Sequence, residues 1–154
     1  MPERLCCPVD AYMLLERRGR LLILRRARET AEETGIQLQP SQMQCAVVIH
    51  HRSPSGQARL GWFFTACPGW VGDPVNREPS KHTGLVWVDP DALPGDMVAY
   101  TWAGLRAWRS GAQFAVHWQE PGSPVHYDPR HEHELTLLPS CPPAVHPRRE
   151  ESAR

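Results

Sequence analysis

Residues 28–36 read R-E-T-A-E-E-T-G-I, and the fold prediction starts from this stretch. On a helix, Glu29, Glu32 and Glu33 are spaced i, i+3 and i+4, so their carboxylates share one face. Like charges at this spacing repel one another by about 0.2–0.5 kcal/mol per pair unless a cation offsets them. Because Mg²⁺ prefers oxygen ligands, the pattern indicates either a divalent-metal site or a solvated acidic surface.

Three neighbouring residues fit the metal-site interpretation. Gly35 can adopt the left-handed conformation that ends a helix, and Ile36 begins the next apolar stretch. Arg28 can form an ion pair with one of the glutamates and so fix the orientation of that carboxylate.

The pattern R-E-x-x-E-E-x-G, followed by an aliphatic residue, resembles the second half of the Nudix box, the signature of the Nudix hydrolase family. The first half of the box, G-x5-E, has no counterpart, because Leu14 and Arg20 stand where the family has its glycine and glutamate. Thr30 also replaces an aliphatic residue of the box. The resemblance covers residues 9–108 and includes W-x-G-D-P-x-N-x-E-P-x-K at 70–81.

The resemblance implies an α/β fold, a Nudix-like α/β/α sandwich around a mixed β-sheet, with part of the box loop and helix missing. Residues 1–112 are expected to form this Nudix-like domain. Prolines interrupt every run in residues 113–154, which predicts a proline-rich C-terminal tail that is partly disordered.

The resemblance also implies a metal-dependent hydrolase that cleaves a nucleoside diphosphate linked to another moiety, with Mg²⁺ or Mn²⁺ as the cofactor. Carried over onto this chain, Glu29 and Glu33 are direct metal ligands, and Glu32 binds a further ion or places the attacking water. Arg28, Glu32 and Glu33 are thus the catalytic candidates. Glu78 is either an additional ligand or base, or a plain surface residue.

The absent half-box leaves a second hypothesis open. A misplacement of the attacking water by about 1 Å can cost roughly 10²-fold in rate, so metal binding can survive where turnover does not. The alternative is therefore a catalytically impaired Nudix-fold module that binds nucleotides or other proteins. A defective version of an ordinary family member is a third possibility.

Apolar periodicity predicts the remaining elements. Two runs flank the turn R-R-G at 17–19 and predict a hairpin. Alternating or continuous apolar stretches predict the other strands, and apolar spacing near 3.6 residues predicts one helix. The predicted strands cover 9–15, 21–26, 43–51, 60–66 and 85–88, and the predicted helix covers 97–108.

Aromatic and sulfur-containing side chains supply candidates for substrate contact and for the core. Alternation along a strand must point some of Trp62, Phe63 and Phe64 to each face, so either one of them stacks on a nucleobase or all three are core. Trp70 lies in a predicted loop and is the other candidate for an exposed stacking residue. Cys45 lies in an apolar strand and is expected in the core.

The histidines suggest a competing metal site. His131 and His133 would share a face of a strand, with His117 and His126 upstream, although surface histidines without a ligand are the simpler interpretation. His50 and His51 are adjacent in a predicted strand, so at most one faces inward. A structural role is expected for that one.

Composition limits the function classes further. The chain has 154 residues, 41% hydrophobic and 22% charged, with a formal net charge of zero, so it fits one globular domain and gives no sign of a stable nucleic-acid complex. Five cysteines without a CxxC pair argue against a disulfide scaffold or a structural zinc site. No apolar run suggests a signal peptide or a membrane partner, so a cytoplasmic protein is expected. The family resemblance implies that its partner is a nucleotide or another small molecule linked to a nucleoside diphosphate.

Overall fold

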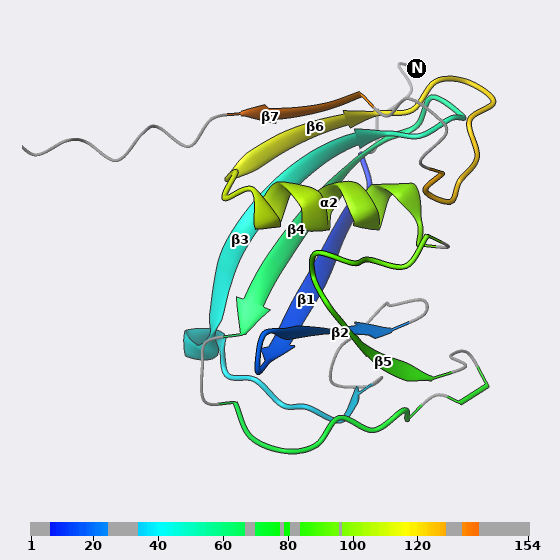
Figure 1. Ribbon diagram of the computed structural model, residues 1–154. Coiled ribbons are helices and arrows are strands. Elements are labelled where there is room, and N and C mark those ends of the chain that lie inside the picture. Colours follow the sequence, from blue (N-terminus) through cyan, green and yellow to red (C-terminus); the bar gives the residue numbers. More distant parts are fainter. Residues whose placement is uncertain are drawn as a thin grey trace, which may run out of the picture.

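Seven strands form one mixed sheet in the part of the chain that the structure, a computed structural model, describes: residues 7–24, 34–66, 70–77, 79–80, 84–95, 97–128 and 134–138. The strand order is β5-β2-β1-β4-β3-β6-β7 (Figure 1). The strands are β1 (Val9–Arg17), β2 (Arg20–Leu24), β3 (Met43–Arg52), β4 (Ala58–Ala66), β5 (Leu85–Val88), β6 (Phe114–Trp118) and β7 (Glu134–Leu138). The described helices are the 3-10 helix η1 (Pro40–Gln42) and the α-helix α2 (Ala99–Arg109).

The first two strands form the predicted hairpin. Arg17 pairs with Arg20, and the two residues between them, Arg18 and Gly19, both have positive φ, at 53° and 72°. Two-residue hairpin turns of this kind match the right-handed twist of the strands they join. The turn therefore fixes the register of β1 against β2, with Leu15 opposite Leu22.

The sheet is mixed, as the family resemblance predicted. Strand β1 runs parallel to β4, and β3 runs parallel to β6, whereas β3 and β4 form an antiparallel pair. Strands β6 and β7 lie between residues 114 and 138, so part of the segment expected as a tail belongs to the sheet.

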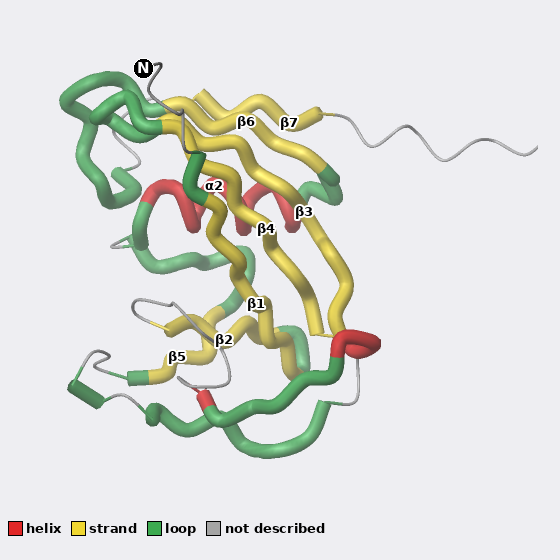
Figure 2. The backbone as a smooth tube through the Cα atoms, turned by 180° about the vertical axis from the view of Figure 1, so that it is seen from behind, coloured by secondary structure: helices red, strands yellow, loops and turns green. Residues whose placement is uncertain are grey.

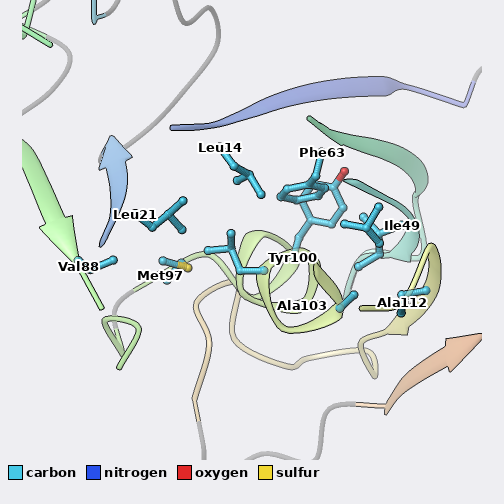
Figure 3. Packing of buried hydrophobic residues seen from close by; sticks show 13 residues of the cluster. Leu14, Leu21, Ile49, Phe63, Val88, Met97, Tyr100, Ala103 and Ala112 are labelled. Atoms are coloured by element: carbon cyan, nitrogen blue, oxygen red, sulfur yellow. The ribbon is translucent and has the colours of Figure 1, made fainter. Parts of the chain in front are cut away.

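Helix α2 covers one face of the sheet (Figures 1 and 3). Tyr100, Ala103, Gly104 and Ala107 recur at helical spacing and are buried against the strands. Gly104 permits the close approach, because a β-carbon at that position would overlap the ring of Phe63 on β4. The buried cluster on this face comprises Leu14, Leu21, Val47, Ile49, Phe63, Val88, Met97, Tyr100, Ala103, Leu105, Ala107, Ala112 and Ala115.

Backbone contacts hold both ends of α2. The N-cap residue Val98 has no capping side chain, and the N–H of Ala99 donates to the carbonyl of Val125 at 3.0 Å. At the other end Gly111 has φ +76°, and the N–H of Ala112 donates to the carbonyl of Ala107 at 3.1 Å, which closes the helix as in a Schellman motif. Among the described residues, no helix combines the length and the apolar composition that crossing a bilayer requires.

The opposite face of the sheet carries a second, smaller buried cluster. Leu15 and Leu22 from the hairpin pack with Ile36 and Trp70, and Met13, Leu38, Ala66, Leu85 and Trp87 adjoin them. Figure 2 shows this face, with α2 behind the strands. Ile36 directly follows the acidic motif in sequence, so the chain leaves that motif on the face opposite α2.

Candidate functional site

The predicted catalytic and metal-binding residues lie outside the described part of the chain. Arg28, Glu29, Glu32 and Glu33 fall in the gap 25–33, and Glu78 falls in a second gap. The missing half-box also predicts a short, strained connection between the strand at 21–26 and the acidic motif, and this connection, residues 26–29, falls in the first gap as well. The structure describes the end of the motif, from Thr34 onward, together with the loop 70–77 and the face of the sheet beside it.

The end of the acidic motif is firmly packed. Thr34 has helical geometry and is buried, and its Oγ1 accepts a hydrogen bond from the N–H of Ile36 at 3.3 Å. Gly35 has φ +73°, which confirms the predicted left-handed residue after the last turn. A short acidic helix needs tertiary contacts to form, and the burial of Ile36 beside Trp70 supplies one immediately after the last glutamate.

The loop 70–77 lies against this motif end. The N–H of Val75 donates to the carbonyl of Thr34 at 3.0 Å, which satisfies one of the carbonyls that a helix end leaves without an intrahelical partner. The guanidinium of Arg77 packs over Gly35, where a β-carbon would lie 2.7 Å from Nε. A positive charge near a helix C-terminus is favourable for the helix dipole. The loop that leads towards Glu78 and the end of the acidic motif are thus joined.

An apolar row crosses the same face of the sheet. Strand register places Ala11, Trp62, Val48, Phe114 and Leu138 side by side on β1, β4, β3, β6 and β7. Because Ala11 alternates in phase with Leu15, this row faces the same side as the cluster around Ile36.

Trp62 is the most exposed aromatic of this row. It is 39% exposed, and its ring is stacked with that of Phe64, with centroids 6.5 Å apart and an interplanar angle of 17°. Phe63 points the other way and is fully buried under α2. The predicted division of these three aromatics between the two faces is confirmed, and Trp62 presents a planar surface on the motif's side of the sheet.

Two histidines form a buried pair under α2. His51 on β3 lies directly opposite His117 on β6, and their Nδ1 atoms are 3.0 Å apart. Both rings are buried, and Tyr100 of α2 lies with its ring centroid 4.8 Å from that of His51. One ring must donate the hydrogen bond and the other accept it, so the pair requires at least one neutral imidazole.

Charged and phenolic groups surround this pair. Arg59 forms an ion pair with Asp10 at 3.2 Å and lies 6.0 Å from the ring centroid of Tyr100. Burial, and then the positive charge of Arg59, lowers the pKa of His51 from 6.5 to about 4. Burial, and then the negative charge of Asp10, raises the pKa of Tyr12 to about 12. Burial also raises the pKa of Tyr100. The cluster is therefore neutral at His51 and at both tyrosines near pH 7.

The histidines do not assemble a metal site within the described ranges, where no group of three or more His, Cys, Asp or Glu side chains could hold an ion. His117 lies in the buried pair, and His126 is exposed at an isolated bridge to Val98. His131 and His133 lie outside the described residues. Of His50 and His51, only His51 is buried, which confirms the prediction for that strand.

Two predictions for single side chains were wrong. Cys45 is exposed, because the register of β3 against β4 shifts between Cys45 and Val47. Trp70 is buried, with 8% of its surface exposed, because its indole N–H donates to the carbonyl of Glu16 at 3.2 Å and its ring joins the cluster around Ile36. A loop tryptophan gives no sequence signal for either contact, because Glu16 lies 54 positions before it and Ile36 is also distant in the sequence.

Solved structures identify the fold. A MutT NUDIX hydrolase from Burkholderia pseudomallei matches with a TM-score of 0.55 at 23% identity, over 66% of this chain and 97% of that chain. A mutator MutT protein from Bacillus halodurans matches with a TM-score of 0.59 at 15% identity, over 85% and 99%. Neither a protein-family model nor a curated protein gives a significant match. The chain has the Nudix fold, and the resemblance read from residues 28–36 is confirmed at that level.

The His51–His117 pair predicts acid sensitivity. Because folding lowers the pKa of His51, the unfolded chain binds the proton more readily, so stability is complete above pH 6.5 and is lost as the pH falls towards 4. We expect the free energy of unfolding to fall by up to about 3 kcal/mol across this window in urea titrations. His51→Asn, which keeps a polar atom near the Nδ1 position, should flatten the dependence, whereas exposed His126→Asn should retain it. An unchanged slope in His51→Asn would contradict this assignment.

Proposed function

We propose that this protein is a divalent-metal-dependent hydrolase of the Nudix type that cleaves the diphosphate of a nucleoside diphosphate linked to another moiety. The Nudix fold and the intact R-E-x-x-E-E-x-G sequence support the reaction class together. The solved relatives are a NUDIX hydrolase and a mutator protein, which supports a nucleotide-derived substrate.

The observation that carries the proposal is the placement of the motif's end. Thr34 and Ile36, directly after the last glutamate, are buried on the face of the sheet that also presents Trp62. Because Thr34 directly follows Glu33 in the chain, its buried position restricts where the carboxylate of Glu33 can lie. A cation held beside the motif end, together with an exposed aromatic on the same face, would suit a ligand with a phosphate end and a base end.

The roles of the acidic residues follow from the chemistry of oxygen donors. Glu29 and Glu33 are proposed to hold Mg²⁺ or Mn²⁺, which when bound neutralises charge on the diphosphate and lowers the pKa of water. Glu32 is proposed to bind a further ion or to orient the attacking water. Arg28 is proposed to hold one of these carboxylates in place through an ion pair.

The second candidate is a Nudix-fold module with impaired catalysis that still binds nucleotides or proteins. The sequence observation that favours it is the absent G-x5-E, with Leu14 and Arg20 at those positions. In the structure Leu14 is a buried core residue of β1 and Arg20 begins β2, so both positions serve the hairpin. Only the first candidate predicts turnover, whereas both would bind their ligand on the same face of the sheet.

Substitution of a proposed metal ligand tests the reaction. Nucleoside triphosphates, nucleotide sugars and dinucleoside polyphosphates would be assayed for phosphate or nucleotide release with Mg²⁺ and with Mn²⁺. We expect metal-dependent turnover by the wild type and a loss of kcat of at least about 10²-fold in Glu33→Gln. Loss of a residue that only supports a metal ligand typically costs about 10- to 100-fold, and loss of a ligand itself should cost more.

The matched control for this test is Glu120→Gln, which removes one carboxylate from an exposed position remote in sequence from the motif. It should leave kcat and KM unchanged. Folded wild-type protein that turns over none of these substrates would contradict the proposal and favour the binding module.

Trp62 is proposed to stack on the nucleobase. Stacking on an aromatic side chain contributes about 1–3 kcal/mol per base, so Trp62→Ala should raise KM by about 5- to 150-fold with little change in kcat. Trp62→Phe keeps a planar ring and should remain close to wild type. Equal KM values for Trp62→Ala and the wild type would show that the nucleobase does not stack on Trp62.

A further inference from the structure

We infer that Arg17 is a positioning residue for the acidic motif: it fixes the loop 70–77, and this loop in turn fixes the end of the motif at Thr34 and Gly35. The inference rests on the proposed function, because the motif that is held is the proposed metal site. It concerns a residue outside the acidic motif, at the end of strand β1 beside the hairpin turn.

Arg17 contacts the start of the loop 70–77 at three points. Its guanidinium lies over the ring of Trp70, 4.1 Å from the ring to Cζ. One terminal nitrogen donates to Oδ1 of Asp73 at 2.9 Å, and the other donates to the carbonyl of Gly72. We call these three contacts the Arg17 clamp. A planar guanidinium can stack and donate in two directions at once, which a lysine ammonium cannot do.

The clamp leads directly to the motif end. Trp70, under the guanidinium, packs against Ile36 and donates its indole N–H to the carbonyl of Glu16, the neighbour of Arg17. Further along the same loop, the N–H of Val75 donates to the carbonyl of Thr34 at 3.0 Å. A chain of contacts therefore runs from the hairpin turn, through the loop, to the residue after Glu33.

The exposed position of the Arg17 clamp indicates that it contributes to the local order of the loop 70–77 more than to the stability of the whole fold. The Arg17 and Asp73 side chains are 34% and 93% exposed, and an ion pair this open contributes little to the stability of the whole fold. Stacking on Trp70 is worth more because that ring is itself buried. Loss of Arg17 should thus loosen the loop and the motif end while the core under α2 stays intact.

Small displacements of catalytic groups have large effects on rate. A shift of about 1 Å can cost roughly 10²-fold, so partial loosening of the motif end should reduce kcat by about 10-fold in Arg17→Ala. Because Arg17 holds protein groups and not the substrate, KM should change by less than about 3-fold. Arg17→Lys keeps the charge beside Asp73 and loses the planar group that stacks on Trp70. Its kcat should therefore lie between those of the wild type and Arg17→Ala.

The test combines steady-state kinetics with amide hydrogen exchange on the whole chain. In Arg17→Ala, exchange at Val75 should become about 10-fold faster, while exchange at Ile49 in the other cluster and the urea midpoint stay at wild-type values. The control is Arg18→Asn, which removes the same charge from the adjacent turn position, where asparagine tolerates the positive φ. It should leave both kinetics and exchange unchanged.

Three results would overturn the inference: unchanged exchange at Val75 in Arg17→Ala, an effect on KM alone, or an equal effect of Arg18→Asn. The first would mean that Arg17 does not order the loop, the second that it contacts the substrate, and the third that only its charge matters. If the wild type turns over no substrate, the proposed function fails, and the exchange measurement alone decides whether the Arg17 clamp orders the motif end.

Discussion

The alternation of side chains along strand β4 is the constraint on which both halves of the molecule depend. Phe63 points into the cluster under α2, where Gly104 leaves room for its ring and Tyr12 stacks on it with centroids 4.7 Å apart. Its neighbour Trp62 must then point to the opposite face. A slip of one residue would exchange core and exposed aromatics along the whole strand. The parallel pairing of β1 with β4, with Ala11 opposite Trp62, extends this alternation to the strand that carries Leu15 and the hairpin.

The two faces of the sheet carry different chemistry. Under α2 lies a mainly apolar core that includes the His51–His117 pair, whose rings are joined by a hydrogen bond and whose burial makes the fold sensitive to acid. On the other face, the end of the acidic motif and Trp62 lie apart on the same surface, with the hairpin and the loop 70–77 around the motif end. The larger of the two buried clusters thus lies on the side of the sheet away from the motif end. Because of this separation, loss of the Arg17 clamp is expected to lower the proposed rate while leaving the core under α2 unchanged.

Much of the fold could be predicted from short-range patterns. The turn at 17–19, five strands and the helix near 97–108 are confirmed, because turn chemistry and apolar periodicity are local signals. Strands β6 and β7 were not predicted, because prolines surround them and their pairing partners are distant in sequence. For the site, alternation predicted that the three aromatics of β4 divide between the two faces, and the structure shows that Trp62 is the exposed one. The burial of Trp70 depends on Arg17 and Glu16, which no local pattern reveals. The acidic residues were found through their motif, and their roles remain proposals.

The central claim is that the acidic motif, whose end at Thr34 to Ile36 leads onto the face opposite α2, is where a divalent cation binds. Titration of Mn²⁺ into isotope-labelled protein tests it most directly, because a bound paramagnetic ion broadens the amide signals nearest to it. The account predicts that broadening is strongest at Thr34, Gly35 and Ile36, with the buried His51 amide spared. Broadening centred on His126 and on the strand Glu134–Leu138, or no site-specific broadening at all, would contradict it.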